Sequence, residues 1–214
     1  MAALNHPEKG DTIKVEPIRT VKDVKAIKRL LADKERDLAL FTLGINTNLR
    51  ASDLLRITVG MVRNLQPGDH FALKEKKTGK DRNISINRTV HAAITALLYV
   101  LPDAKDNDLL FQSRKVTQRK PVLKDGKEVR QPAKGEISVP TLNGLVKLWC
   151  KEINLTGNYG SHTLRKTFGY MHRTINKTDL PTLMQMFNHS SQKQTLDYLC
   201  IQPEEIKNAY MFEL

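Results

Sequence analysis

Apolar residues recur at intervals of three and four along most of the chain, and this spacing is the strongest constraint on its fold. It is clearest from Thr20 to Leu31, where lysines separate the apolar positions, and it is typical of amphipathic helices. One stretch, residues 70–86, instead alternates apolar and polar residues on either side of a basic turn at Thr78-Gly79, which predicts a β-hairpin. The sequence therefore predicts a mostly α protein with a small antiparallel β-sheet, an α+β fold.

The helical pattern breaks at glycine, proline and polar clusters, and these breaks set the expected elements. Thr20 is expected to cap the first helix. Gly44 and the polar stretch Asn46-Thr47-Asn48 are expected to end the second. Residues 113–138 are rich in Lys and Arg and are expected to form either a second hairpin or a flexible loop. Helices are expected at 20–31, 34–43, 51–56, 88–101, 140–155, 162–175, 180–187, 192–200 and 203–212.

Charge and cysteine content narrow the classes of function. The 214 residues carry a formal net charge of +12, which favours a polyanionic partner, most simply nucleic acid. Cys150 and Cys200 lack paired spacing, so a disulfide framework and a zinc knuckle are not expected. No apolar run has the length of a membrane helix and no signal peptide is evident. A reduced, cytoplasmic setting is therefore expected, without a membrane.

Six residues that could act on a phosphodiester are spread over four separate segments. His162 and Arg165 are three apart in SHTLRKTFGYMH, a spacing that places both on one face of a helix. His189 precedes Tyr198 by nine residues in NHSSQKQTLDYL. The remaining two are Arg50 in NLRASDLLRI and Lys77 at the tip of the predicted hairpin.

In this order and spacing the six residues resemble the motifs of the tyrosine recombinase family, the site-specific recombinases of phage-integrase type. The resemblance covers residues 20–205. It implies the catalytic-domain fold of that family and cleavage and rejoining of DNA through a 3′-phosphotyrosine, with no metal or cofactor. It also implies four protomers acting on double-stranded DNA through a Holliday-junction intermediate, with the protein a monomer or weak dimer when DNA is absent.

Physical chemistry gives the cations of this set a purpose. A phosphodiester under attack gathers negative charge on its non-bridging oxygens, and planar guanidinium groups bind two such oxygens at once. Arg50 and Arg165 are assigned to this clamp. His162 and His189 can add hydrogen bonds to the same oxygens, and His162 could also take a proton from the nucleophile.

Tyr198 is the expected nucleophile, forming the phosphotyrosine link. The leaving 5′ oxygen needs a proton, and a lysine on the hairpin could supply it. Lys77 fits the lysine-turn pattern of the family best, while Lys76 and Lys80 remain possible. Basic residues near the site and in the 113–138 segment are expected to contact the DNA backbone: Lys76, Lys80, Arg82, Arg114, Lys115, Arg119 and Lys120.

Two positions depart from the pattern of the family. Asn48 and Asn188 stand where the family usually has glycine before the first arginine motif and before the late histidine. Asparagine is the next best residue for a left-handed backbone conformation, so the local geometry is expected to survive.

The expected organisation is a flexible arm at 1–19, the catalytic domain at 20–202 and a tail helix at 203–214 that docks on a neighbouring protomer. Only 49 residues precede Arg50, whereas most members of the family carry a separate DNA-clamping domain there. The chain is therefore either a catalytic fragment or a small stand-alone recombinase similar to the fimbrial-switch invertases.

Three alternatives remain open at this point. A type IB topoisomerase uses a similar set of residues but acts as a monomer without sequence preference. A DNA-binding regulator could occupy an inactive recombinase scaffold, although all six catalytic positions are filled. A basic RNA-binding or ribosomal module is also compatible with the charge, although aromatic residues make up only 6% of the chain and no stacking motif is present. Taken singly, each of the six residues is well explained by a structural role.

Overall fold

The structure is a computed structural model that describes residues 15–118, 122–124, 127–129, 132–200, 207–208 and 210–213. The helices within these residues are α1 Val21–Leu30, α2 Glu35–Asn46, α3 Ala51–Leu54, α4 Val59–Val62, α5 Arg88–Tyr99, α6 Val139–Glu152, α7 Ser161–Thr174, α8 Leu180–Phe187 and α9 Gln192–Leu199. The strands are β1 His70–Lys74, β2 Asp81–Ser85, β3 Gln112–Gln118, β4 Val122–Lys124, β5 Lys127–Val129 and β6 Pro132–Glu136.

The predicted fold class is confirmed, and most helices begin where the sequence signals placed them. Thr20 caps α1 as expected, because its hydroxyl accepts a hydrogen bond from the backbone N–H of Asp23. The predicted end of the second helix is wrong, since α2 continues through Gly44 to Asn46. A Cβ atom at Gly44 would lie 2.5 Å from Leu164 Cδ1. Close packing against α7 therefore keeps this glycine helical despite its low propensity.

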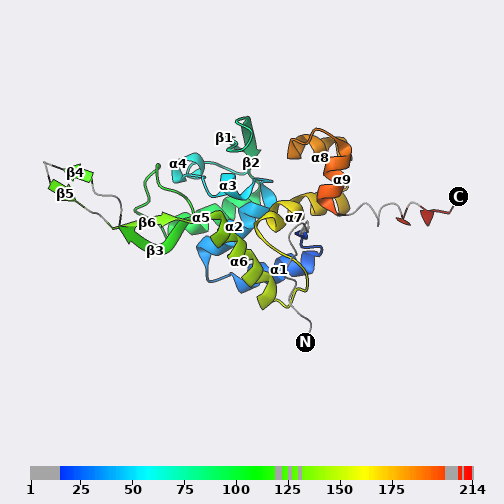
Figure 1. Ribbon diagram of the computed structural model, residues 1–214, viewed down its shortest axis with the longest axis horizontal. Helices are drawn as coiled ribbons and strands as arrows, with labels where there is room; N and C mark the ends of the chain where they lie inside the picture. The colour runs from blue at the N-terminus through cyan, green and yellow to red at the C-terminus, as the bar shows by residue number, and fades with distance from the viewer. Residues whose placement is uncertain are drawn as a thin grey trace, which may run out of the picture.

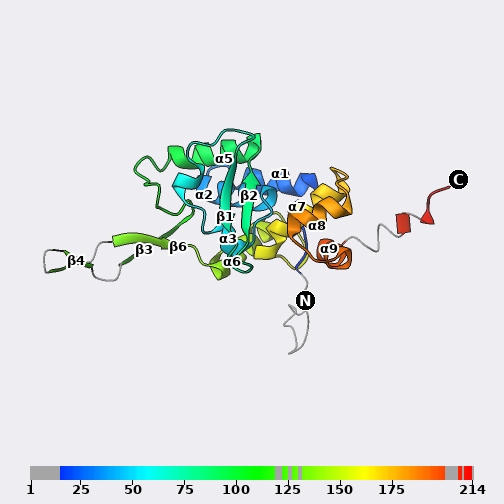
Figure 2. The same ribbon diagram turned by 90° about the horizontal axis from the view of Figure 1, so that it is seen from above.

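The predicted hairpin is confirmed. Strands β1 and β2 pair antiparallel, with Phe71 opposite Ile84, and both of these side chains are buried. Of the two alternatives for residues 113–138, the structure shows the hairpin: β3 pairs antiparallel with β6, and β4 with β5. These strands project from one end of the molecule, opposite the C-terminus (Figures 1 and 2).

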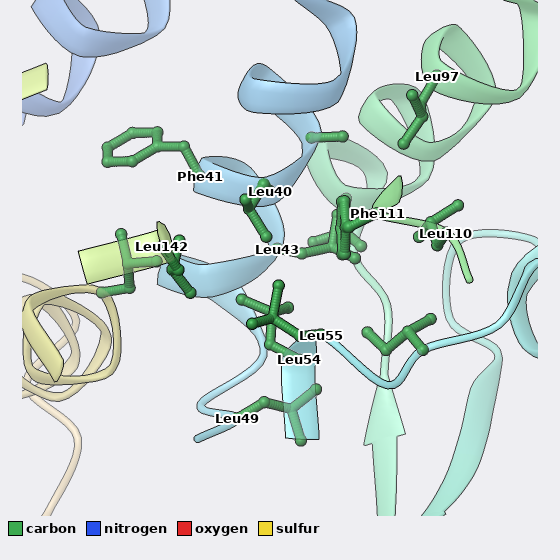
Figure 3. Packing of buried hydrophobic residues seen from close by; sticks show 14 of the residues in the cluster. Leu40, Phe41, Leu43, Leu49, Leu54, Leu55, Leu97, Leu110, Phe111 and Leu142 are labelled. Atoms are coloured by element: carbon green, nitrogen blue, oxygen red, sulfur yellow. The ribbon is translucent and has the colours of Figure 1, made fainter. Parts of the chain in front are cut away.

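Helix α2 is the centre of the main hydrophobic core. Leu40, Phe41 and Leu43 are fully buried on it and lie between α5, α6 and the segment around Phe111 (Figure 3). The Phe41 ring meets the ring of Trp149 edge to face at 5.9 Å between centroids. This core fixes the frame on which α7 lies, because α2 packs against α7.

A second, smaller core joins α7 to α8 and α9. Its buried members are Phe168, Leu183, Phe187 and Leu199. The α8–α9 pair and the β1–β2 hairpin lie on the same side of the molecule (Figure 1). The hairpin that carries Lys77 and the helical pair that carries His189 and Tyr198 therefore lie on one side of the molecule.

The segments near the two ends of the chain differ in how they pack against the domain. Residues 15–19, the last part of the segment expected to be a flexible arm, lie on the domain: Ile18 is fully buried and its N–H donates to Thr167 Oγ1 at 2.9 Å. The expected tail helix lies mostly outside the described residues, although 207, 208 and 210 are helical. None of the helices in the described ranges has the length and apolarity to cross a membrane.

Candidate active site

Arg165, on the first turns of α7, is the most deeply buried of the predicted catalytic residues, with 3% of its surface exposed. Its Nη1 donates to the backbone oxygen of Asn48 at 2.7 Å, and its Nη2 to that of Phe187 at 2.9 Å. The guanidinium carbon lies 5.0 Å from the centroid of the Phe187 ring. Burial lowers the pKa of Arg165 to about 10, so the group stays charged at neutral pH.

The two asparagines that replace glycine hold left-handed backbone conformations, as expected. Asn48 has a φ of +53° and Asn188 a φ of +55°. The Asn48 turn aims its carbonyl at Arg165, and its Nδ2 donates to the backbone oxygen of Met186 at 2.7 Å. Asn188 ends α8 and turns the chain toward His189. Both substitutions therefore keep the geometry that the site requires.

Arg50 is the residue before the first turn of α3 and forms an ion pair with Glu75, with 2.6 Å between Nη1 and Oε2. A purely structural reading of the sequence would pair Arg50 with Asp53, three residues on. The structure does not do so, because Asp53 Oδ1 accepts the backbone N–H of Lys76 at 2.9 Å. Arg50 is thus turned toward the lysine-bearing hairpin.

Glu75 is a part of the site that the sequence motifs did not reveal. Only 2% of it is exposed, and it accepts hydrogen bonds from Thr78 Oγ1 at 2.6 Å and from Arg82 Nη1 at 3.2 Å. Burial alone would raise the pKa of Glu75, but Thr78 and the two arginines outweigh it and lower the pKa to about 2. Its signal lay in the strand alternation, because Glu75 continues the inward face of Phe71 and Leu73.

The hairpin turn places Lys76, Lys77 and Lys80 at the surface beside this cluster. Lys80 Nζ donates to Asn188 Oδ1 at 3.3 Å, and Arg82 Nη2 donates to the backbone oxygen of Met186 at 2.9 Å. The hairpin is therefore attached to the C-terminal end of α8.

His162 lies on the first turn of α7 with an exposed side chain. Partial desolvation lowers the pKa of its imidazole below the usual value, and four nearby cations lower it further. These cations are Arg165, Lys166, Arg50 and Lys77. The structure thus brings three other predicted catalytic residues, Arg50, Lys77 and Arg165, close enough for their charges to act on His162, and His162 is neutral at pH 7.

His189 follows α8 and stacks on Phe187 at 5.1 Å between ring centroids. Its ring centroid lies 5.4 Å from that of Tyr198, and its Nδ1 lies 3.1 Å from Thr195 Oγ1. Burial, followed by the charges of Arg165 and Arg50, lowers the pKa of His189 to about 4. The imidazole is therefore neutral at pH 7, with Nδ1 engaged by the protein.

Tyr198, on α9, has a buried hydroxyl without a hydrogen-bond partner among the described residues. Burial raises the pKa of this phenol to about 12, although the charges of Arg165 and Arg50, and the close approach of the Arg165 N–H groups to the hydroxyl, act in the opposite direction. Lys166, which the motifs did not single out, places Nζ 5.1 Å from the centroid of the Tyr198 ring and donates to Cys200 Sγ at 3.3 Å. The phenol is thus held in a dry position beside cations.

A hollow of about 450 Å³ opens beside the tyrosine. The residues around it are Lys166, Ser191, Lys193, Gln194, Asp197 and Tyr198. Within the described ranges, no three His, Cys, Asp or Glu side chains come together as they would to hold a metal ion.

The residues expected to contact DNA are placed unequally. The Arg82 side chain is only 17% exposed and is engaged inward, so it is a structural part of the hairpin. Arg114 is 65% exposed and pairs with buried Asp37 at 3.1 Å. Arg119, Lys120 and the side chain of Lys115 lie outside what the structure describes.

Comparison with known proteins agrees with this geometry. The model of the phage integrase family matches residues 20–205. The chain is 34% identical over 199 residues to the probable integrase/recombinase YoeC of Bacillus subtilis, covering 92% of this chain and 95% of YoeC. It is 30% identical over 179 residues to the tyrosine recombinase XerC of Caldanaerobacter subterraneus, covering 82% of this chain but only 44% of XerC.

Among solved structures, the XerH site-specific recombinase in a post-cleavage complex with its palindromic difH substrate aligns with a TM-score of 0.63 and 17% identity. The alignment covers 89% of this chain and 50% of XerH. This likeness shows a shared fold, and the sequence matches establish kinship. The chain belongs to the phage integrase family of site-specific tyrosine recombinases.

Proposed function

We propose that residues 20–202 form a catalytic domain that cleaves and rejoins double-stranded DNA through a 3′-phosphotyrosine on Tyr198. The observation that carries this proposal is the Tyr198 hydroxyl, which is buried, lacks a hydrogen-bond partner among the described residues and lies near two arginines. A buried polar group without a partner is costly to a fold. A scissile phosphate bound beside Arg50 and Arg165 would present its phosphorus atom to this hydroxyl as the electrophile. Its negatively charged oxygens would pair with the two guanidinium groups.

In the cleavage step, the Tyr198 oxygen attacks phosphorus and forms a P–O bond as the bond from phosphorus to the 5′ oxygen breaks. The two guanidinium groups stabilise the charge that gathers on the non-bridging oxygens. Because carbonyl groups already fix Arg165, its remaining N–H groups are oriented before DNA arrives. Rejoining reverses the step, when a 5′ hydroxyl attacks the phosphotyrosine.

Proton transfer is assigned to the two polar side chains at the edge of the site. Neutral His162 accepts the proton of the Tyr198 hydroxyl, and Lys77 gives a proton to the leaving 5′ oxygen. His189 donates a hydrogen bond to a phosphate oxygen from Nε2, which requires the Thr195 hydroxyl to donate its proton to His189 Nδ1, 3.1 Å away, in place of the backbone oxygen of Ser191 at 3.3 Å. With a pKa of about 4, His189 serves as a neutral donor at pH 7.

Double-stranded DNA is the proposed partner, and the net charge of +12 suits such a polyanion. The exposed lysines of the hairpin, Lys76 and Lys80, and exposed Arg114 are proposed to contact the DNA backbone. We place the reaction on the bacterial nucleoid, in the cytoplasm. The active assembly is proposed to be a homotetramer on DNA, formed from a monomer or weak dimer.

The tail at 203–214 is proposed to dock on a neighbouring protomer in that assembly. Tyr210, Met211 and Phe212 support this role because they are 80%, 67% and 76% exposed, an apolar run that a second copy could cover. Deleting residues 203–214 should reduce assembly on DNA, measured by sedimentation, more than it reduces covalent cleavage of a single half-site. Equal losses of both would contradict the docking role.

Covalent capture tests the central proposal. The full chain is mixed with sheared bacterial DNA, denatured in detergent, and the attached DNA is sequenced. Wild-type protein should retain DNA at one short sequence, and Tyr198→Phe should retain none. Tyr99→Phe is the matched control, because this tyrosine is 85% exposed on α5 and its hydroxyl has no assigned role.

The other outcomes separate the alternatives. Adducts scattered without sequence preference would indicate a type IB topoisomerase. Duplex binding without any adduct, in wild type and Tyr99→Phe alike, would contradict the proposed cleavage activity and favour a regulator. Adducts that persist in Tyr198→Phe would contradict the choice of nucleophile.

A further inference from the structure

Glu75 joins two parts of the site that the chemistry requires to act together. Its Oε2 lies 2.6 Å from Arg50 Nη1 and accepts a hydrogen bond of 2.6 Å from Thr78 Oγ1. Thr78 is the residue after Lys77. A single buried carboxylate oxygen therefore contacts both the phosphate clamp and the turn that presents the proposed proton donor.

The turn itself is closed on Glu75. The backbone N–H of Glu75 donates to the oxygen of Lys80, and the N–H of Gly79 donates to the oxygen of Glu75, both at 2.9 Å. The other carboxylate oxygen accepts Arg82, whose second terminal nitrogen donates to Met186. Glu75 is thus anchored from three sides, while Lys77 extends from the turn into solvent.

From this geometry we infer that Glu75 is a positioning residue, one that holds the Lys77 turn at a fixed place relative to Arg50 so that the proton reaches the leaving oxygen. The inference rests on the proposed function, in which Lys77 is the proton donor. A long lysine on an untethered turn samples many positions, and proton transfer needs the donor within hydrogen-bond reach of the leaving atom. Glu75 would act through Lys77 and would not touch the DNA.

The chemistry of the carboxylate explains why the charge matters. All three groups that face Glu75 are hydrogen-bond donors, and an ionised carboxylate only accepts. Glu75→Gln replaces one oxygen with NH₂, so a donor then faces either Arg82 or the pair formed by Arg50 and Thr78. The isosteric change should therefore release one side of the anchor while keeping the volume of the side chain.

A change of leaving group isolates this effect. Single-turnover formation of the covalent adduct is measured on a synthetic duplex of the sequence recovered by capture, with the scissile 5′ oxygen either retained or replaced by sulfur. A thiolate leaves without a proton because thiols have a pKa of about 8.5. Loss of the proton donor should therefore slow cleavage of the oxygen duplex and leave the sulfur duplex almost unaffected.

Three variants carry the test. Glu75→Gln should lower the ratio of the oxygen rate to the sulfur rate at least tenfold. Thr78→Val, which removes the hydroxyl that links Glu75 to the turn but leaves both arginine pairs, should lower the same ratio. Thr78→Ser keeps the hydroxyl and should restore the ratio to within threefold of wild type. A merely structural role would slow both duplexes equally and leave the ratio unchanged.

The reference variant is Lys77→Ala. If sulfur rescues Lys77→Ala but the ratio in Glu75→Gln stays at the wild-type value, the positioning role is refuted while the proposed function stands. Faster cleavage by Glu75→Gln would also refute it, since Glu75 would then shield Arg50 from phosphate. If sulfur fails to rescue Lys77→Ala, the assignment of the proton donor in the proposed function is wrong, and the inference fails with it.

Discussion

Substituting Gly169 by alanine should impair catalysis far more than folding. Gly169 is buried on α7, where a Cβ atom would lie 2.4 Å from Leu199 Cδ2 and 2.5 Å from Phe187 Cζ. Contacts this short force the neighbouring groups to move. The Phe187 ring stacks on His189 at 5.1 Å and lies 5.2 Å from the ring of Tyr198, so the displaced groups are those that position the proposed nucleophile.

The two effects of Gly169→Ala on stability oppose each other. Overpacking a core costs about 1–3 kcal/mol, and replacing glycine by alanine inside a helix regains about 1 kcal/mol. The free energy of unfolding should therefore fall by only about 0–2 kcal/mol. Displacing a reacting group by about 1 Å can cost roughly 100-fold in rate, and we expect a loss of that order in covalent adduct formation.

The assay pairs urea denaturation with single-turnover adduct formation on the captured sequence. Gly144→Ala is the matched control, because apart from its chain neighbours and the backbone of α6 no atom of the structure lies within 4 Å of the site of its Cβ. This variant should gain up to about 1 kcal/mol and cleave at the wild-type rate. Adduct formation by Gly169→Ala within threefold of wild type would refute the link between this contact and the nucleophile.

Three further predictions follow from single groups. Tyr198→Phe should abolish the adduct. The same change should raise the free energy of unfolding, measured by urea denaturation, by about 1 kcal/mol, because it removes a buried hydroxyl without a partner. A lower free energy of unfolding would contradict this prediction. Asn188→Ala should cost about 1–2 kcal/mol through its left-handed backbone, and Asn188→Gly should stay near wild type by the same measurement. Because the pKa of His189 is about 4 in the fold and near 6.5 when unfolded, protons bind preferentially to the unfolded chain. Stability should therefore fall as pH decreases from about 6.5 to 4, and melting of His189→Gln across this range should show a shallower fall.

The ordered motifs were enough to predict the proposed catalytic set. Each motif can be read from a short stretch of sequence, and all of them occur in the order found in one family. The same holds for the left-handed turns at Asn48 and Asn188, since backbone preference follows from residue type. These predictions needed no knowledge of which segments meet in space. In the folded chain, His162 lies near Arg50, Arg165 and Lys77, so motifs that are far apart in sequence meet in space.

What the sequence could not supply is the pairing between distant segments. Arg82 was expected to contact DNA, yet its partners are Glu75, which directly follows the facing strand β1, and Met186, 104 residues away. An arginine beside a basic turn carries no local sign of which way it faces. The helical Gly44 was missed for a similar reason, because its close contact with Leu164 of α7 outweighs a local preference that would end the helix.

A site that collects this much positive charge must offset its own repulsion before DNA arrives, and the C-terminal end of α8 does part of this. Backbone carbonyls at the end of a helix carry partial negative charge. At the end of α8 the backbone oxygen of Phe187 accepts a hydrogen bond from Arg165, and that of Met186 accepts one from Arg82. Glu75 supplies a full negative charge between Arg50 and Arg82. Because fixed protein groups hold the cations, their orientation costs little when phosphate binds. The same carbonyls end the helix that leads into His189, so the groups that orient the clamp also fix the path of the chain toward Tyr198.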